Sequence, residues 1–119
     1  MLAEDEATVR ELTARILRQH GYKILTATNG EEALRVVQKE RGDAIKLIIT
    51  DIVMPRMGGK ELALKINQLR PSLKILFMSG YTDNAIVQNE MLQTNAAFLQ
   101  KPFTPEHIVR KVREILDSM

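Results

Sequence analysis

The sequence "KLIIT", residues 46–50, is a short, mostly apolar run that ends at a single acid, Asp51. A continuous apolar run of this length is typical of a strand buried on both faces, as in parallel sheets covered by helices. The next residues, "DIVMPRMGG" (51–59), include a proline and two glycines and therefore predict a stiff loop. The stretch predicts a buried strand that presents one carboxylate where it ends.

Strand-like and helix-like segments alternate on both sides of this run. Apolar runs predict further strands at 22–28, 73–78 and 96–100, and the first residues of the chain belong to another. Apolar residues at helical spacing predict helices at 6–20, after Asn29, and at 59–69, 83–92 and 105–118.

Residues that commonly start or stop helices stand at the predicted ends. They are Gly21, Asn29, Pro71, Asp83 and the Thr104–Pro105 pair. The apolar residues expected to face the core are Val9, Leu12, Ile16 and Leu17 in the first helix, Ala33, Leu34 and Val37 in the second, and Ile108, Val112, Ile115 and Leu116 in the last.

Single strands separated by single helices favour parallel pairing with right-handed crossovers. We therefore predict an α/β fold in one domain over 1–119, a (βα)5 doubly wound sheet of five parallel strands. Few residues precede the first acidic cluster, whereas a strand usually has about five. The first strand is therefore expected to be truncated at its N-terminus, inside a longer chain.

Composition excludes several classes of function. The formal net charge is +2, from 17 basic and 15 acidic residues, which is too balanced to indicate direct nucleic acid binding. The absence of cysteine excludes disulfides, thiolate catalysis and zinc–thiolate sites. No apolar run approaches the ~20 residues that span a bilayer, so no membrane insertion by this segment is expected.

Polar residues follow four of the predicted strands. They are Glu4, Asp5 and Glu6 after the first strand, Asp51 after the third, Ser79 after the fourth and Lys101 after the fifth. Sites in such sheets lie at the carboxyl ends of the strands, near the point where the strand order reverses. We therefore expect these residues to converge on one rim, although each alone could be an ordinary strand end or surface charge.

The expected rim has a specific chemistry. Carboxylates close together repel unless a cation neutralises them, and carboxylate oxygens suit Mg²⁺. A carboxylate can also act as a nucleophile and form an acyl phosphate. Lys101 and Ser79 would supply a positive charge and a hydrogen-bond donor for phosphoryl oxygens. The set matches the needs of a phosphoryl-accepting aspartate.

Four motifs carry a resemblance to a known family. They are Glu4-Asp5-Glu6, "DIVMPRMGG" (51–59), "MSGYT" (78–82) and "KPF" (101–103). Together they resemble the receiver domain of two-component response regulators over essentially the whole chain. The resemblance implies a flavodoxin-like strand order, 2-1-3-4-5.

The resemblance also implies a role for each acid. Asp51 would accept a phosphoryl group from the phosphohistidine of a histidine kinase. Glu4, Asp5, Asp51 and the backbone carbonyl of Val53 would hold Mg²⁺. The family more commonly has Asp where this chain has Glu4. Valine at position 53 offers no group to orient a water, so a long-lived acyl phosphate is expected.

Further implied residues concern the switch. Ser79 and Lys101 would bind the phosphoryl oxygens. Ser79 and Phe98 would act as switch residues for an output surface within 83–118, although Phe98 could equally be ordinary core. A cis peptide bond is expected between Lys101 and Pro102.

The implied partner is a histidine kinase or a phosphotransfer domain in the cytoplasm, with only self-phosphorylation and autodephosphorylation as enzymatic activity. The segments "FMSGYTD" (77–83) and 98–116 are most similar to the C-terminal receiver of a hybrid sensor histidine kinase. The downstream partner and a phosphorylation-dependent homodimer stay open.

Two other classes of function are compatible with a sheet of this kind. An independent enzyme is disfavoured because Phe77 and Met54 stand where a hydrolase elbow and a phosphate-binding loop would need glycine. A pseudo-receiver, with the same fold used only for protein binding, is the alternative that stays open.

Overall fold

The computed structural model describes residues 1–40, 45–54, 56–79, 97–101 and 103–118. Five parallel strands form one sheet in the order β2-β1-β3-β4-β5, as predicted. The strands are β1 (Leu2–Ala3), β2 (Thr26–Ala27), β3 (Leu47–Asp51), β4 (Lys74–Ser79) and β5 (Ala97–Gln100). The helices are α1 (Ala7–Gln19), α2 (Gly30–Lys39), α3 (Gly59–Leu69) and α5 (Pro105–Asp117).

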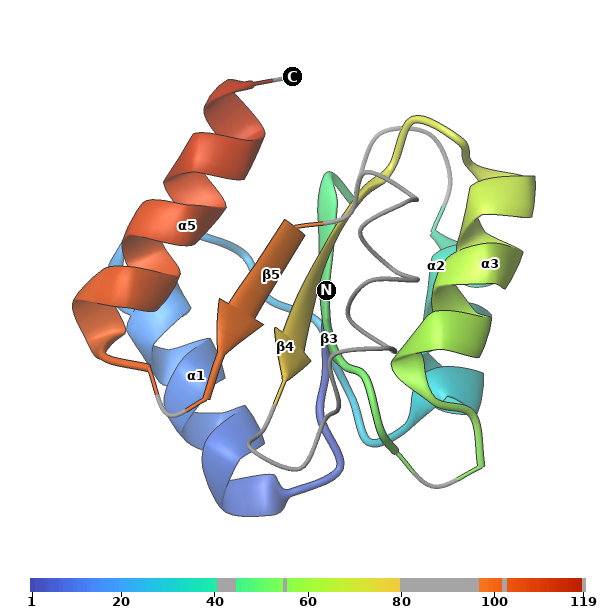
Figure 1. Ribbon diagram of the computed structural model, residues 1–119, viewed down its shortest axis with the longest axis horizontal. Coiled ribbons are helices and arrows are strands. Elements are labelled where there is room, and N and C mark those ends of the chain that lie inside the picture. The colour runs from blue at the N-terminus through green and yellow to red at the C-terminus, as the bar shows by residue number, and fades with distance from the viewer. Residues whose placement is uncertain (41–44, 55, 80–96, 102, 119) are drawn as a thin grey trace.

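Helices cover both faces of the sheet. Figure 1 shows α1 and α5 on one face and α2 and α3 on the other. The strand β3 is buried along its whole length, and its side chains alternate between the two faces. Ile48 packs into the core under α2 and α3, while Leu47 and Ile49 pack under α1 and α5. The "KLIIT" run therefore forms the central strand of a doubly covered sheet.

The predicted helix ends are confirmed in the described residues. The Asn29 side chain accepts a hydrogen bond from the Glu32 amide at 2.9 Å, and Thr104 does the same for His107 at 3.1 Å. Gly21 follows the C-cap of α1 with a positive φ of 92°, a conformation that glycine adopts without strain. These local signals set where each helix starts and stops.

The strand β2 is shorter than the predicted 22–28. It comprises Thr26–Ala27, and Tyr22 and Ile24 instead pack at the margin of the core beneath α1 and α5. The reason is the partner strand. β2 pairs with β1, and because β1 has only two residues, the paired stretch of β2 is equally short. Whether β1 belongs to a longer strand stays a prediction.

The buried face of α1 also differs from the predicted one. Thr13, Ala14 and Leu17 are buried, whereas Leu12 is 54% exposed. Residues 12 and 14 lie roughly 200° apart around a helix, so they cannot share a face. The small Ala14 lies against the sheet and turns Leu12 toward solvent. In α5, Ile108 and Val112 are buried as predicted, while Ile115 and Leu116 are only partly buried.

Some predictions fall outside the described residues. They concern the 83–92 helix with its Asp83 cap, residue 96 of the last strand, and the Lys101–Pro102 bond. Among the described helices, none combines the length and apolar character that crossing a bilayer requires.

Candidate functional site

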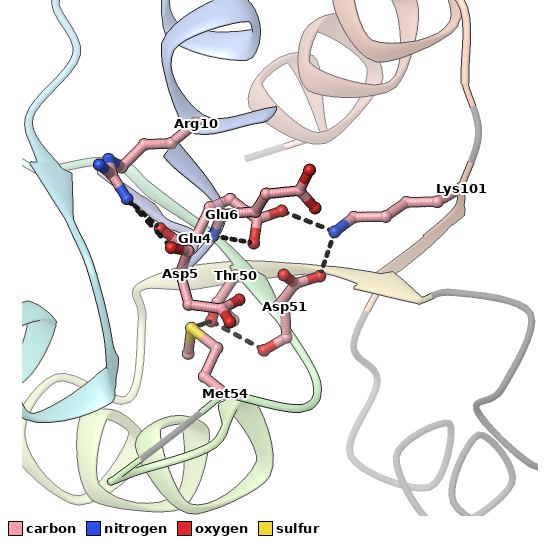
Figure 2. A network of polar contacts seen from close by, with 8 residues as sticks. All are labelled: Glu4, Asp5, Glu6, Arg10, Thr50, Asp51, Met54 and Lys101. Carbon is pink, nitrogen blue, oxygen red and sulfur yellow. Dashed lines mark hydrogen bonds and ion pairs between the residues drawn. The ribbon is translucent and has the colours of Figure 1, made fainter. Parts of the chain in front are cut away.

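The carboxyl ends of three strands bring the predicted rim residues together. Ala3 of β1 pairs with Thr50 of β3, so Glu4 and Asp51 each come one residue later on neighbouring strands. Lys101 directly follows β5. In the sheet, β4 lies between β5 and β3. Figure 2 shows the three side chains pointing toward one another from these separate strands.

Lys101 bridges two carboxylates. Its Nζ lies 2.6 Å from Oε1 of Glu4 and 2.7 Å from Oδ1 of Asp51. Both carboxylates are shielded from solvent, with Glu4 1% and Asp51 7% exposed. A buried charge is tolerated when it is paired, and here one ammonium serves two acids. In the described core of the site, two acidic side chains therefore share one cationic partner.

Glu4 uses both oxygens of its carboxylate. Oε1 accepts from Lys101, and Oε2 accepts from the backbone N–H of Glu6 at 3.2 Å. Burial alone would raise the pKa of Glu4, but hydrogen bonds with Asp51 and Lys101 hold that pKa below its usual value. Glu4 is therefore the ionised member of the buried pair.

Asp51 has the opposite shift. Burial raises the pKa of Asp51 to about 8, and the neighbouring Glu4 adds to the effect while Lys101 opposes it. Burial would lower the pKa of Lys101, but Asp51 and Glu4 outweigh it and raise that pKa. Burial therefore favours the protonated form of Asp51 over the ionised one.

A third acid completes the cluster. Carboxylate oxygens of Glu4, Asp5 and Asp51 lie within 4.8 Å of one another, so one ion could contact all three. Asp5 is exposed, while the other two are buried. Burial and the proximity of Glu4 raise the pKa of Asp5. An all-oxygen donor set with one open side fits Mg²⁺, which retains several waters.

The loop after β3 holds the Asp51 backbone tightly. The Thr50 hydroxyl donates to the carbonyl oxygen of Asp51 at 3.0 Å. Helix α3 begins directly against this carbonyl: a Cβ on Gly59 would lie 2.1 Å from it. Only glycine fits at such a distance, so Gly59 allows the start of α3 to pack directly against the Asp51 backbone.

The Val53 side chain is 72% exposed on the same loop. It contributes no polar atom to this loop, and the long-lived acyl phosphate expected from it stays a prediction. The proposed role of its backbone carbonyl as a metal ligand stays a prediction.

The two predicted switch residues are described to different extents. Ser79 ends β4 beside Gln100, but its side chain lies outside the described atoms. Phe98 is partly buried on β5, and its ring lies 5.5 Å from the buried ring of Phe77, measured between centroids, at an interplanar angle of 31°. The contact places Phe98 against the core cluster of Ile52 and Phe77.

The structure thus brings together Glu4, Asp5, Asp51 and Lys101. Glu6 is exposed and stands at the N-cap of α1, outside the acidic cluster. One contact of the site was not predicted: Arg10 of α1 donates to the carbonyl oxygen of Glu4 at 2.8 Å. The presence of an arginine one helical turn after the acidic motif was the only signal in the sequence. It did not predict the contact, because a hydrogen bond from a side chain to a backbone carbonyl depends on no particular residue type at the acceptor.

The fold and the site together define a class of protein. A central parallel strand ends in a buried aspartate, two acids follow the adjacent strand, and a lysine that follows a third strand contacts the aspartate and the first of the two acids. This arrangement is that of a receiver domain. The family model for the response regulator receiver domain matches residues 1–113, and the chain belongs to that family.

Relatives at the sequence level come from different architectures. The chain is 34% identical over 118 residues to the sensor kinase CckA of Brucella abortus, covering 99% of this chain and 12% of that protein. It is also 34% identical over 116 residues to the response regulator receiver protein CpdR of the same organism, covering 98% of this chain and 94% of that protein.

Solved structures agree on the fold. A CheY-like receiver domain protein from Methanospirillum hungatei superposes with a TM-score of 0.89 at 30% identity, covering 98% of this chain and 91% of that one. The receiver domain of NtrX from Brucella abortus also gives 0.89, at 26% identity, covering 99% and 98% of the two chains. Receiver domains act in two-component phosphorelay signalling with histidine kinases or phosphotransfer partners, and this chain is one of them.

Proposed function

We propose that the chain accepts a phosphoryl group on Asp51 from the phosphohistidine of a histidine kinase or phosphotransfer domain, with Mg²⁺ as cofactor. The observation that carries the proposal is the double contact of Lys101 with Glu4 and Asp51, at 2.6 and 2.7 Å. A single ammonium between a buried acceptor and a buried acid is placed to contact the oxygens of an incoming phosphoryl group.

A cation would favour the reactive form of the acceptor. A protonated carboxyl group is a poor nucleophile, and burial, together with Glu4, raises the pKa of Asp51 to about 8. Glu4, Asp5 and Asp51 would hold Mg²⁺, with the Val53 carbonyl as a further proposed ligand. When bound, the cation supplies positive charge that ionises Asp51 and neutralises phosphoryl oxygens.

The transfer step needs no reactant besides the phosphohistidine donor, and the proton that Asp51 gives up on ionising passes to solvent. An oxygen of the ionised Asp51 carboxylate forms a bond to phosphorus as the P–N bond to the donor imidazole breaks. The electron pair of that bond goes to the imidazole nitrogen, and the product is an acyl phosphate on Asp51. Lys101 moves its hydrogen bond from the carboxylate to the phosphoryl oxygens, and the Ser79 hydroxyl would donate a second one.

The same contacts would switch the domain. A phosphoryl group adds nearly two negative charges and new acceptor oxygens. Lys101 and Ser79 gain these partners only in the phosphorylated form, so that form is stabilised over the resting one. Phe98 would change its contact with Phe77 in response, and the surface within 83–118 would carry the output.

The alternative is a pseudo-receiver that uses the fold only to bind other proteins. The experiment that separates the two treats the protein with Mg²⁺ and acetyl phosphate and records the intact mass. A gain of one phosphoryl group that Asp51→Asn abolishes is the expected result. A parent protein that gains no mass, and shows no spectral change with beryllium fluoride, is a pseudo-receiver.

We also propose that this receiver, over 1–119, is one part of a longer hybrid sensor kinase in the cytoplasm. The resemblance of residues 77–83 and 98–116 supports that context, as does the CckA relative, of which the chain spans 12%. The CpdR relative, of which it spans 94%, fits a stand-alone receiver instead. Reading the coding sequence upstream of Met1 separates these two contexts.

A further inference from the structure

We propose that Arg10 is a positioning residue for the acidic cluster: it fixes the turn between β1 and α1 so that the carboxylates of Glu4 and Asp5 face Asp51. By doing so it strengthens Mg²⁺ binding. The inference rests on the proposed function, because the site that Arg10 positions is the one assigned there to Mg²⁺.

The contacts of Arg10 are with the backbone of the acidic pair. Its Nη1 lies 2.8 Å from the carbonyl oxygen of Glu4 and 3.5 Å from that of Asp5. The first distance is that of a strong charge-assisted hydrogen bond, and the second is at the limit of one. Figure 2 shows Arg10 reaching this turn from α1, on the side away from Lys101.

The two acids differ in how firmly the rest of the protein holds them. Glu4 is buried, its backbone N–H donates to the Ala27 carbonyl at 3.0 Å, and its carboxylate contacts Lys101 and the Glu6 amide. Asp5 is exposed, so packing does little to orient its carboxylate. Glu6, at the N-cap of α1, makes no capping bond with its side chain. The partly buried Arg10 contacts both backbone carbonyls and therefore helps to fix the Asp5 carboxylate relative to the anchored Glu4.

The two possible roles of Arg10, positioning of the turn and electrostatic repulsion of the ion, predict opposite changes in Mg²⁺ affinity when Arg10 is replaced. A guanidinium near the cluster repels a divalent cation, so removal of its charge alone would tighten Mg²⁺ binding. Loss of the bond to Glu4 would instead free the turn and weaken binding, because partners that orient metal ligands contribute to affinity. The direction of the change in dissociation constant therefore separates the two roles.

The test compares Arg10→Met, which removes charge and donors, with Arg10→Lys, which keeps the charge and one donor. Arg15→Met is the matched control, since Arg15 is an exposed arginine of the same helix. Each protein is titrated with magnesium chloride at fixed ionic strength, followed by amide chemical shifts, and its melting temperature is recorded. We expect about 10-fold weaker binding in Arg10→Met, a smaller loss in Arg10→Lys and no change in Arg15→Met.

The outcomes are distinct. Equal or tighter binding in Arg10→Met, whatever its melting temperature, overturns the inference and leaves the proposed function standing. If Arg10→Met does not fold, Arg10→Gln, which removes the charge and shortens the side chain, replaces it, and equal or tighter binding in that variant overturns the inference. A parent protein whose Mg²⁺ binding is absent, or is the same in Asp51→Asn, contradicts the proposed function itself.

Discussion

Lys101 Nζ lies 2.6 Å from Oε1 of Glu4, a residue 97 positions earlier in the chain. The same nitrogen lies 2.7 Å from Asp51, so one side chain joins the ends of β1, β3 and β5. This contact ties the electrostatics of the site to the order of the strands. A change at any of the three residues is therefore expected to alter both stability and chemistry.

Replacement of Asp51 by Asn is expected to stabilise the metal-free protein at pH 8. The folded pKa of about 8 lies above the unfolded value of 3.8, so the contribution of Asp51 to stability is fully present below pH 3.8 and is lost as pH rises through 8. Urea denaturation at pH 5 and pH 8 measures this, with a difference of a few kcal/mol, at order of magnitude, expected between parent and variant. The prediction is contradicted if the difference in unfolding free energy between parent and variant is the same at pH 8 as at pH 5.

Addition of Mg²⁺ is expected to raise the stability of the parent protein in a saturable manner. A ligand at ten times its dissociation constant adds about 1.4 kcal/mol, because it binds the folded state alone. Thermal melts at increasing magnesium chloride, with calcium-free buffers and a chelator as baseline, provide the measurement. The gain should be much smaller in Asp51→Asn and in Asp5→Asn, and an equal gain in all three proteins would place the ion elsewhere.

Replacement of Lys101 by Ala is expected to permit some phosphorylation while blunting the response of Phe98. The acids and the acceptor remain, but the contact that moves toward the phosphoryl group is lost. Chemical shifts of the Phe98 ring and amide, with and without beryllium fluoride, report the response. Lys74→Ala, at the exposed start of β4, is the control. Equal shift changes at Phe98 in Lys101→Ala and the parent would refute the role of Lys101.

Replacement of Val53 by Asn is expected to shorten the lifetime of the acyl phosphate. Val53 is 72% exposed beside the acceptor and offers no atom to orient a water, whereas an amide does. Loss of label from the phosphorylated protein, followed over time, should be several-fold faster in Val53→Asn. Val53→Ala serves as the control for size, and an unchanged rate in Val53→Asn rules the idea out.

Replacement of Gly59 by Ala is expected to destabilise the fold by more than about 2 kcal/mol. The added Cβ would lie 2.1 Å from the Asp51 carbonyl oxygen, and that atom is backbone and cannot turn aside. Chemical denaturation provides the measurement, with Leu64→Ala on the exposed side of α3 as the control. Similar stability in Gly59→Ala and the parent would show that α3 can move away from β3 at little cost.

Much of the fold was predictable because strong local signals agreed. The apolar run at 46–50 required a strand covered on both faces, and single strands between helices required parallel pairing. Once the strands were parallel, their carboxyl ends had to share one edge. Glu4, Asp51 and Lys101 could therefore be predicted to converge although they are far apart in the sequence.

The predictions were wrong where tertiary contacts determine the length of a strand or the buried face of a helix. Residues 22–28 have strand-like composition, but the length of β2 is limited by the two residues of β1 that pair with it. Leu12 matched a helical period, yet the packing of Ala14 against the sheet fixed which side of α1 is buried. The bond from Arg10 to the Glu4 carbonyl depends on backbone geometry, which residue types alone do not encode.

The ring contact between Phe77 and Phe98 has a consequence for the surface of the domain. Phe98 lies on β5, at the edge of the described sheet, and its side chain is partly buried. Under the proposed function, a change in the Phe98 rotamer would alter how completely Phe77 is covered and how much apolar surface the edge of the sheet exposes. That movement would link phosphorylation of Asp51 to the binding of another molecule at this edge.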